Sequence, residues 1–126
     1  MKHELEVILR NAEDCLSDAE FNLKHDRLRA AANRAYYCIF DCITALLHTK
    51  GVYSKTHQGA HTQFRLFFVK TKVMSISLDE VLIAVFDLRQ SCDYDFEFDP
   101  NVGDVAAAVN GAREFFEATK AFLSNT

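Results

Sequence analysis

The sequence is poor in the residues that make tight turns, with 4 glycines and 1 proline among 126 residues. A β-sandwich or β-barrel needs a turn about every 8–12 residues, so this scarcity argues against both classes. No run of apolar residues approaches the roughly 18 that a membrane-spanning helix needs. The N-terminal residues also lack the apolar core of a signal peptide, and we therefore expect a cytoplasmic protein without a membrane span.

The sequence has 4 cysteines but no CxxC pair, and each cysteine lies within an apolar, periodic segment. This placement indicates small buried side chains rather than a disulfide framework or a zinc ribbon. Positive charge is limited too, because 14 Lys and Arg against 18 Asp and Glu give a net charge of −4. The chain therefore lacks the broad basic surface of a non-specific DNA-binding protein, although a local cationic pocket remains open.

Common catalytic motifs are missing as well: the sequence contains no GxSxG, P-loop, HExxH or dinucleotide-binding GxGxxG. Several large enzyme classes are thereby excluded in their usual form. His57 and His61 stand four residues apart and could share a helix face, but no third metal ligand lies in that segment. We therefore expect neither a metal ion nor a cofactor.

Apolar residues recur at steps of three and four along the chain, which predicts five helices and an all-α fold. The expected helices cover residues 3–23, 26–50 and 57–70, a segment after Ser77 and a segment after Pro100. Either Ser54 or Thr56 can cap the third helix. Ser77 and Glu80 have the spacing of a capping box at the fourth helix, and Pro100 suits the first position of the fifth.

The segment 26–50 is apolar around most of its circumference, so we expect this helix at the centre of the fold. No repeat, low-complexity tract or linker interrupts the chain. The sequence therefore predicts a single domain over residues 1–126, an up-and-down bundle of four to five antiparallel helices.

Arg89 breaks the apolar pattern of the fourth helix, where it follows Leu82 by seven residues and Val85 by four. An arginine keeps its charge, so on this face it needs a carboxylate, carbonyl or phosphate partner. One interpretation is a structural ion pair with Asp41 or Asp93. The other is an arginine positioned to bind a phosphate.

A polar stripe runs beside the apolar face of the second helix, again at steps of three and four. Its members are Arg34, Tyr37, Asp41, Thr44 and His48. A solvated face would carry lysine and glutamate, whereas hydroxyl, guanidinium and carboxylate groups suit a hydrogen-bonded network or an interface. The stripe is therefore either a partly buried structural network or part of a binding surface.

Residues 93–99 alternate carboxylates with aromatic side chains. Phe98 stands at the sixth position, where a calcium-binding loop needs glycine, so that motif is excluded. We expect a fraying helix end whose aromatic rings dock on the core while the acidic groups face water.

Residues 33–40 (NRAYYCIF) resemble the central helix of HEPN-domain proteins, the higher-eukaryote and prokaryote nucleotide-binding fold. Residues 45–47, 55–59 and 89–95 fit the same small prokaryotic subfamily, in the same order and spacing. The resemblance implies an α-helical bundle that is commonly a homodimer. Many such proteins are encoded beside a minimal nucleotidyltransferase, with which they form a toxin–antitoxin pair.

The resemblance also implies a site. Active members are metal-independent ribonucleases with an arginine followed after four to six residues by a histidine, and two such motifs meet across the dimer. The arginine corresponds to Arg89, but Asp93 and Tyr94 stand where the histidine is expected. Histidine titrates near neutral pH, whereas tyrosine is a poor base and the negative charge of Asp93 repels a phosphate. His57 or His61 could replace the missing histidine only if the third helix brings one close to Arg89.

We therefore expect an interaction or nucleotide-binding module that partners a minimal nucleotidyltransferase and has weak or no catalytic activity. The candidate nucleotide-binding or interface cluster consists of Arg34, Tyr37, Asp41 and His57. In some related pairs the transferase adenylylates a tyrosine beside the motif, which implies Tyr94 as the acceptor. The alternative is a metal-independent ribonuclease that uses Arg89 for the phosphate and Tyr94, Asp93 or His57 for proton transfer. A third interpretation is a nucleotide sensor without a transferase.

Overall fold

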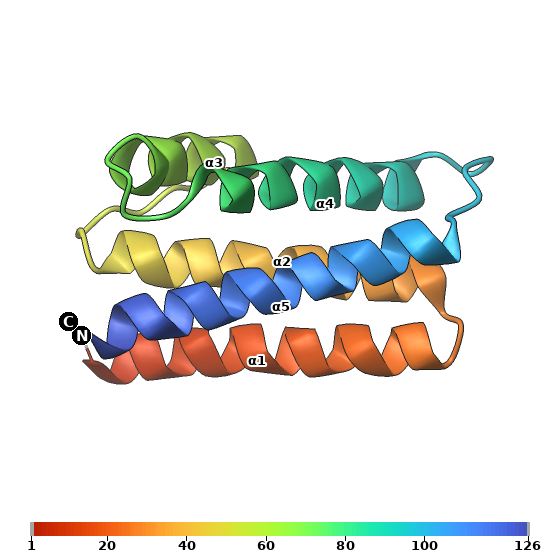
Figure 1. The fold of residues 1–126 in the computed structure, drawn as a ribbon, viewed down its shortest axis with the longest axis horizontal. Coiled ribbons are helices and arrows are strands. Elements are labelled where there is room, and N and C mark those ends of the chain that lie inside the picture. Colours follow the sequence, from red (N-terminus) through yellow and green to blue (C-terminus); the bar gives the residue numbers. More distant parts are fainter. Residues whose placement is uncertain (1, 126) are drawn as a thin grey trace.

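The structure, a computed structural model, describes residues 2–125, which form five α-helices and one short π-helix. The elements are α1 (Lys2–Lys24), α2 (Leu28–His48), α3 (His57–Phe64), the π-helix η1 (Arg65–Val69), α4 (Ile76–Tyr94) and α5 (Val102–Ser124). The four long helices run alternately in opposite directions, so the start of α1 and the end of α5 lie at the same end of the bundle (Figure 1). The predicted all-α, up-and-down architecture is confirmed.

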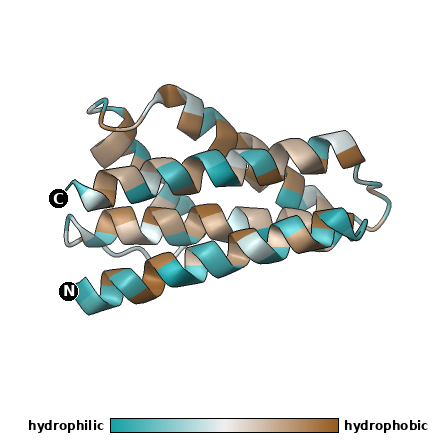
Figure 2. Cartoon of the chain, turned by 60° about the horizontal axis from the view of Figure 1, so that its bottom comes forward, coloured by the Kyte–Doolittle hydropathy of each residue, from teal (hydrophilic) through white to brown (hydrophobic). Residues whose placement is uncertain are grey.

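Helix α2 lies at the centre of the bundle, as its apolar circumference predicts, and contacts α1, α3, α4 and α5. Tyr36, Ile39 and Ile43 on this helix are completely buried. Burying a large apolar side chain contributes roughly 1.5–3 kcal/mol, so this helix holds the fold together. The helices that cover it are amphipathic, and hydrophilic and hydrophobic residues alternate along α1 in Figure 2. Within residues 2–125 no helix is both long and apolar enough to cross a bilayer.

The starts of α4 and α5 differ from the predicted ones. Helix α4 begins at Ile76 with Ser75 at the N-cap, and neither Ser77 nor a capping box caps it. The reason is local, because the Ser75 and Ser77 hydroxyls lie 2.6 Å apart and bind each other. Helix α5 begins two residues after Pro100, since the Asn101 side chain accepts a hydrogen bond from the backbone N–H of Asp104 (3.1 Å) and makes Asn101 the N-cap.

The third predicted helix, over 57–70, forms as two pieces, because the α-helical turns give way to π-helical turns at Arg65. Of the two expected caps Thr56 is the one used, and its hydroxyl accepts a hydrogen bond from the Gly59 N–H (2.9 Å). A Cβ at Gly59 would lie 2.8 Å from that hydroxyl oxygen, so only glycine leaves room for the cap. This cap fixes the start of α3 and with it the position of His57.

Candidate functional site

Arg89 lies on the buried face of α4, in line with Leu82 and Val85, as the periodicity predicts. Only 8% of its surface is exposed. A guanidinium cannot lose its charge at physiological pH, so burial on this scale requires partners close by.

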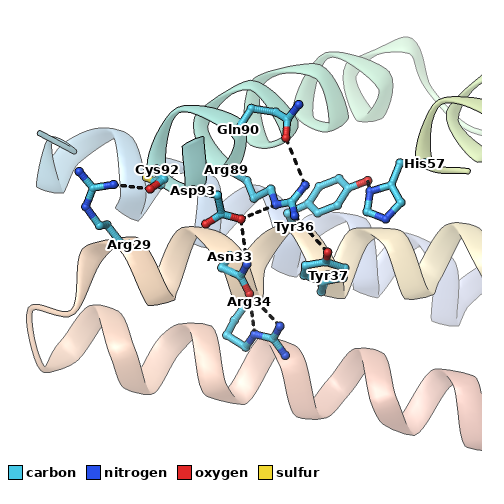
Figure 3. Close-up of polar contacts among 10 residues, drawn as sticks. All are labelled: Arg29, Asn33, Arg34, Tyr36, Tyr37, His57, Arg89, Gln90, Cys92 and Asp93. Carbon is cyan, nitrogen blue, oxygen red and sulfur yellow. Dashed lines mark hydrogen bonds and ion pairs between the residues drawn. The ribbon is translucent and has the colours of Figure 1, made fainter. Parts of the chain in front are cut away.

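Three polar side chains surround the Arg89 guanidinium (Figure 3). Its Nη1 donates to Gln90 Oε1 (3.2 Å) and its Nη2 donates to the Tyr37 hydroxyl (3.1 Å). Its Nε lies 2.8 Å from Asp93 Oδ2, so the acid that neutralises Arg89 is Asp93 and not Asp41. The Nε–H is not aligned for a hydrogen bond with this carboxylate, which leaves a buried donor unused. Within residues 2–125 one other buried side-chain nitrogen or oxygen atom lacks a hydrogen-bond partner, His48 Nε2.

Aromatic rings enclose the same guanidinium. Its central carbon lies 5.4 Å from the ring centroid of Tyr36, 5.3 Å from that of Tyr37 and 5.6 Å from that of Tyr94. Such distances are within the range of cation–π attraction, which strengthens where water is excluded. Tyr94, a residue that the sequence places in the site, thus contacts Arg89, while 70% of its surface stays exposed.

The Tyr36 hydroxyl connects this cluster to two histidines of α3. It lies 3.0 Å from His57 Nδ1 and 2.9 Å from His61 Nε2. A phenol has a single proton, so it donates to one ring and accepts an N–H from the other. Burial raises the pKa of Tyr36 well above its ordinary value. The cluster therefore holds the Tyr36 hydroxyl in its neutral form.

Both histidines are neutral at pH 7. Burial lowers the pKa of His61 to about 4, with a further contribution from the charge of Arg65. Burial also lowers the pKa of His57, and the nearby charge of Arg89 acts in the same direction. The third helix thus brings His57 close to the site, but Tyr36 stands between its ring and the guanidinium. Sequence reasoning does not single out Tyr36 for this role, although a hydroxyl within the apolar segment 26–50 was the available signal.

Arg34 and Tyr37 belong to the same site. The Arg34 guanidinium donates from Nε (3.0 Å) and Nη2 (2.7 Å) to Asn33 Oδ1, and it lies 5.2 Å from the centroid of the Tyr37 ring. The Asn33 amide in turn donates to Asp93 Oδ2 (3.3 Å). Asp93 therefore lies between Asn33 and Arg89, where it balances the charge of the guanidinium.

Asp41 lies apart from Arg89. Its Oδ2 accepts a weak hydrogen bond from the Cys15 thiol (3.8 Å), and burial raises the pKa of Asp41 to about 6. It lines, together with His57, a separate hollow of about 350 Å³. The predicted cluster of four residues is thus divided between two neighbouring places. The stripe on α2 is connected only in part: Arg34 Nη1 donates to the Cys15 sulfur (3.8 Å), whose thiol donates to Asp41, whereas Thr44 donates to the Phe40 carbonyl (3.0 Å).

The prediction for residues 93–99 is wrong in one respect, because most of their aromatic rings do not dock on the core. Phe96 is 98% exposed and Tyr94 is largely exposed, and only Phe98 is partly buried. The physical reason is the Arg29 side chain, which donates hydrogen bonds to the carbonyls of Cys92 and Phe98. These two hydrogen bonds fix both ends of the segment, so its middle points into solvent.

Metal binding finds no support in the geometry of the histidine pair, since both rings turn a nitrogen towards Tyr36. In the part of the chain that the structure describes, no three His, Cys, Asp or Glu side chains lie close enough together to hold a metal ion.

The comparison with known families decides the classification. The HEPN domain family matches residues 5–122. The chain belongs to the HEPN-domain family. This HEPN domain is 30% identical over 122 residues to "Putative toxin MJ0142" of Methanocaldococcus jannaschii, covering 97% of the chain and 83% of that protein. It is 35% identical over 117 residues to a "UPF0332 protein" of Thermotoga maritima, covering 90% of the chain and 88% of that protein. The resemblance inferred from residues 33–40 and 89–95 is confirmed.

Proposed function

We propose that this HEPN domain binds a phosphate group of an RNA or a nucleotide at Arg89, and that it cleaves RNA weakly or not at all. The observation that carries the proposal is the buried Arg89 guanidinium, which is balanced by a single carboxylate. Asp93, the partner of Arg89, also lines a hollow of about 480 Å³ together with Arg29 and Arg34. Guanidinium groups match phosphate oxygens in geometry and charge.

Weak cleavage follows from what stands beside Arg89. Attack by a ribose 2′-hydroxyl needs a proton acceptor, a proton donor and positive charge on the phosphate. The Asp93 carboxylate reduces that positive charge. The nearest histidine, His57, has its Nδ1 engaged by the Tyr36 hydroxyl. The arrangement therefore favours binding over chemistry.

We further propose that residues 1–126 act as one cytoplasmic HEPN domain in a toxin–antitoxin pair, as a homodimer and with a minimal nucleotidyltransferase as partner. Two relatives carry the word toxin in their names. The exposed ring of Tyr94, which lies over Arg89, would be accessible to a transferase that adds an adenylyl group. Co-expression with the transferase, followed by mass spectrometry of wild-type and Tyr94→Phe protein, tests this role. An adenylylated Tyr94→Phe variant would show that the acceptor is another residue.

One observation favours the alternative, a metal-independent ribonuclease. His57, Tyr36 and Arg89 form a continuous row in which a neutral imidazole could take up a proton. The row would supply the histidine that the motif lacks, from a different helix. In this case Arg89 would bind the scissile phosphate and His57 would serve as the base.

Incubation of a fluorescent single-stranded RNA with the protein in EDTA separates the two functions, because binding and cleavage are both measured. Wild type is compared with Arg89→Ala, Arg89→Lys and, as a matched control, Arg10→Ala on the exposed side of α1. Binding that is lost in Arg89→Ala but kept in the control, with no cleavage by any variant, supports the binding module. Cleavage that disappears in Arg89→Ala identifies a ribonuclease. Unchanged binding by a folded Arg89→Ala variant contradicts both.

A further inference from the structure

A second hollow, of about 350 Å³, lies beside the Arg89 site and has no role in the function proposed above. Helix α2 contributes one wall, and the connection to α3 with the first residue of α3 contributes the other. The side chains that give it its chemistry are Phe40, Asp41, Thr44, Tyr53, Lys55 and His57. Its volume is within the range of hollows that hold small ligands in proteins.

One wall of this hollow is flat and aromatic. The His57 ring stacks on the Phe40 ring, with centroids 4.5 Å apart and planes 28° apart. Tyr53 lies at the rim with 81% of its surface exposed. A flat wall with an accessible aromatic ring beside it suits a planar heterocycle, because nucleic-acid bases stack on aromatic side chains.

On the α2 side of the hollow the polar groups are acceptors, while Lys55 on the opposite side supplies N–H donors. Within residues 2–125 the Asp41 carboxylate accepts one hydrogen bond, the long one from the Cys15 thiol. The Thr44 hydroxyl uses its proton on the Phe40 carbonyl, so it also presents lone pairs. A ligand that offers two neighbouring N–H donors therefore fits best. Guanine has this pattern at N1 and at its exocyclic amino group, while adenine and uracil do not.

We propose that this hollow binds a guanine base of the RNA or nucleotide whose phosphate binds at Arg89. The two places adjoin, because the His57 ring of the hollow lies 5.9 Å from the ring of Tyr37, which is hydrogen-bonded to Arg89. One strand can therefore place a phosphate on the guanidinium and a base against His57 and Phe40. The inference rests on the proposed phosphate site and adds a base preference to it.

The test uses fluorescent RNA pentanucleotides of uridine with guanosine, inosine or adenosine at the central position. We expect wild type to bind the guanosine strand roughly tenfold more tightly than the adenosine strand, and the inosine strand in between, since inosine lacks the amino group. Asp41→Asn should abolish this preference, and Tyr53→Ala should weaken all three strands. The matched controls are Asp14→Asn and Phe21→Ala, because Asp14 is an exposed carboxylate of α1 and Phe21 is an exposed aromatic residue of α1 that does not line the hollow.

The outcomes separate this inference from the function on which it rests. If Arg89→Ala abolishes binding of every strand but wild type shows no preference for guanosine, the base site is refuted and the phosphate site stands. If wild type binds none of the strands, the phosphate site is refuted. NMR titration with guanosine monophosphate then decides the base site alone, since shifts at Thr44 and Tyr53 support it and their absence overturns it.

Discussion

Two buried regions of the bundle differ in the side chains that fill them, since one is apolar and the other is polar. Around Ile39 and Ile43 the centre of α2 is closed by apolar side chains alone. Around Tyr36 the same helix packs against a buried cation, a buried imidazole and a partly buried imidazole, which are held by specific hydrogen bonds. Apolar packing needs only volume and shape, whereas the polar region works only with its particular partners. The first region accounts for the fold, and the second is where we expect function.

The largest effect should come from a charge in the apolar region. Ile39→Asp places a carboxylate where no partner is available, at a cost of several kcal/mol against a typical total stability of 5–15 kcal/mol. We expect this variant to lose its helical circular dichroism. Ile83→Asp, at an exposed position of α4, is the matched control and should stay folded. A soluble and fully helical Ile39→Asp variant would contradict the central place of α2.

The polar region should make the protein less stable as the pH falls. The pKa of His61 in the folded protein, about 4, lies below its ordinary value near 6.5, so the folded state binds fewer protons than the unfolded state between these values. This contribution to stability is complete above pH 6.5 and is lost as the pH falls towards 4, by up to about 3 kcal/mol. Urea denaturation of wild type and His61→Gln at pH 7 and pH 4.5 measures it. An equal loss of stability in both proteins would show that His61 is not responsible.

Asp41 should change the stability of the protein with pH in the opposite direction to His61, and by a smaller amount. Its pKa in the folded protein, about 6, is higher than the ordinary value, so its protonated form favours folding. This contribution is complete below about pH 4 and is lost as the pH rises through 6. Asp41→Asn should therefore gain stability over wild type at pH 8, by less than about 1 kcal/mol because water screens a half-exposed carboxylate. A variant that is less stable than wild type at pH 8 would indicate a stabilising role for the charge.

Periodicity alone predicts the apolar region almost completely, and the polar region only in part. The spacing of Leu82, Val85 and Arg89 places the arginine correctly, because it depends on a single helix. Its ion pair with Asp93 is also within reach of spacing, since the two residues stand four apart on α4, whereas the separation of Asp41 from Arg89 depends on how α2 and α4 pack. The contact between Tyr36 and His57 joins two helices in the same way.

The exposed segment after α4 shows a second limit. An alternation of acids and aromatic rings favours docking of the rings on the core. Two hydrogen bonds from Arg29, which is distant in the sequence, instead hold the segment so that most of its rings point into solvent. The start of α4 shows the same limit on a smaller scale, since two serine hydroxyls that could cap the helix bind each other. In both cases a specific hydrogen bond overrides a valid local tendency.

The central claim is that Arg89 binds a phosphate group and that the Asp93 carboxylate beside it weakens this binding. The affinity of a fluorescent single-stranded RNA for wild type and for Asp93→Asn, measured by anisotropy in EDTA, tests it most directly. Removal of the carboxylate that lies 2.8 Å from Arg89 Nε should tighten binding by about tenfold. Asp87→Asn, an exposed position on the same helix, should leave the affinity unchanged. Equal or weaker binding by a folded Asp93→Asn variant would contradict the account.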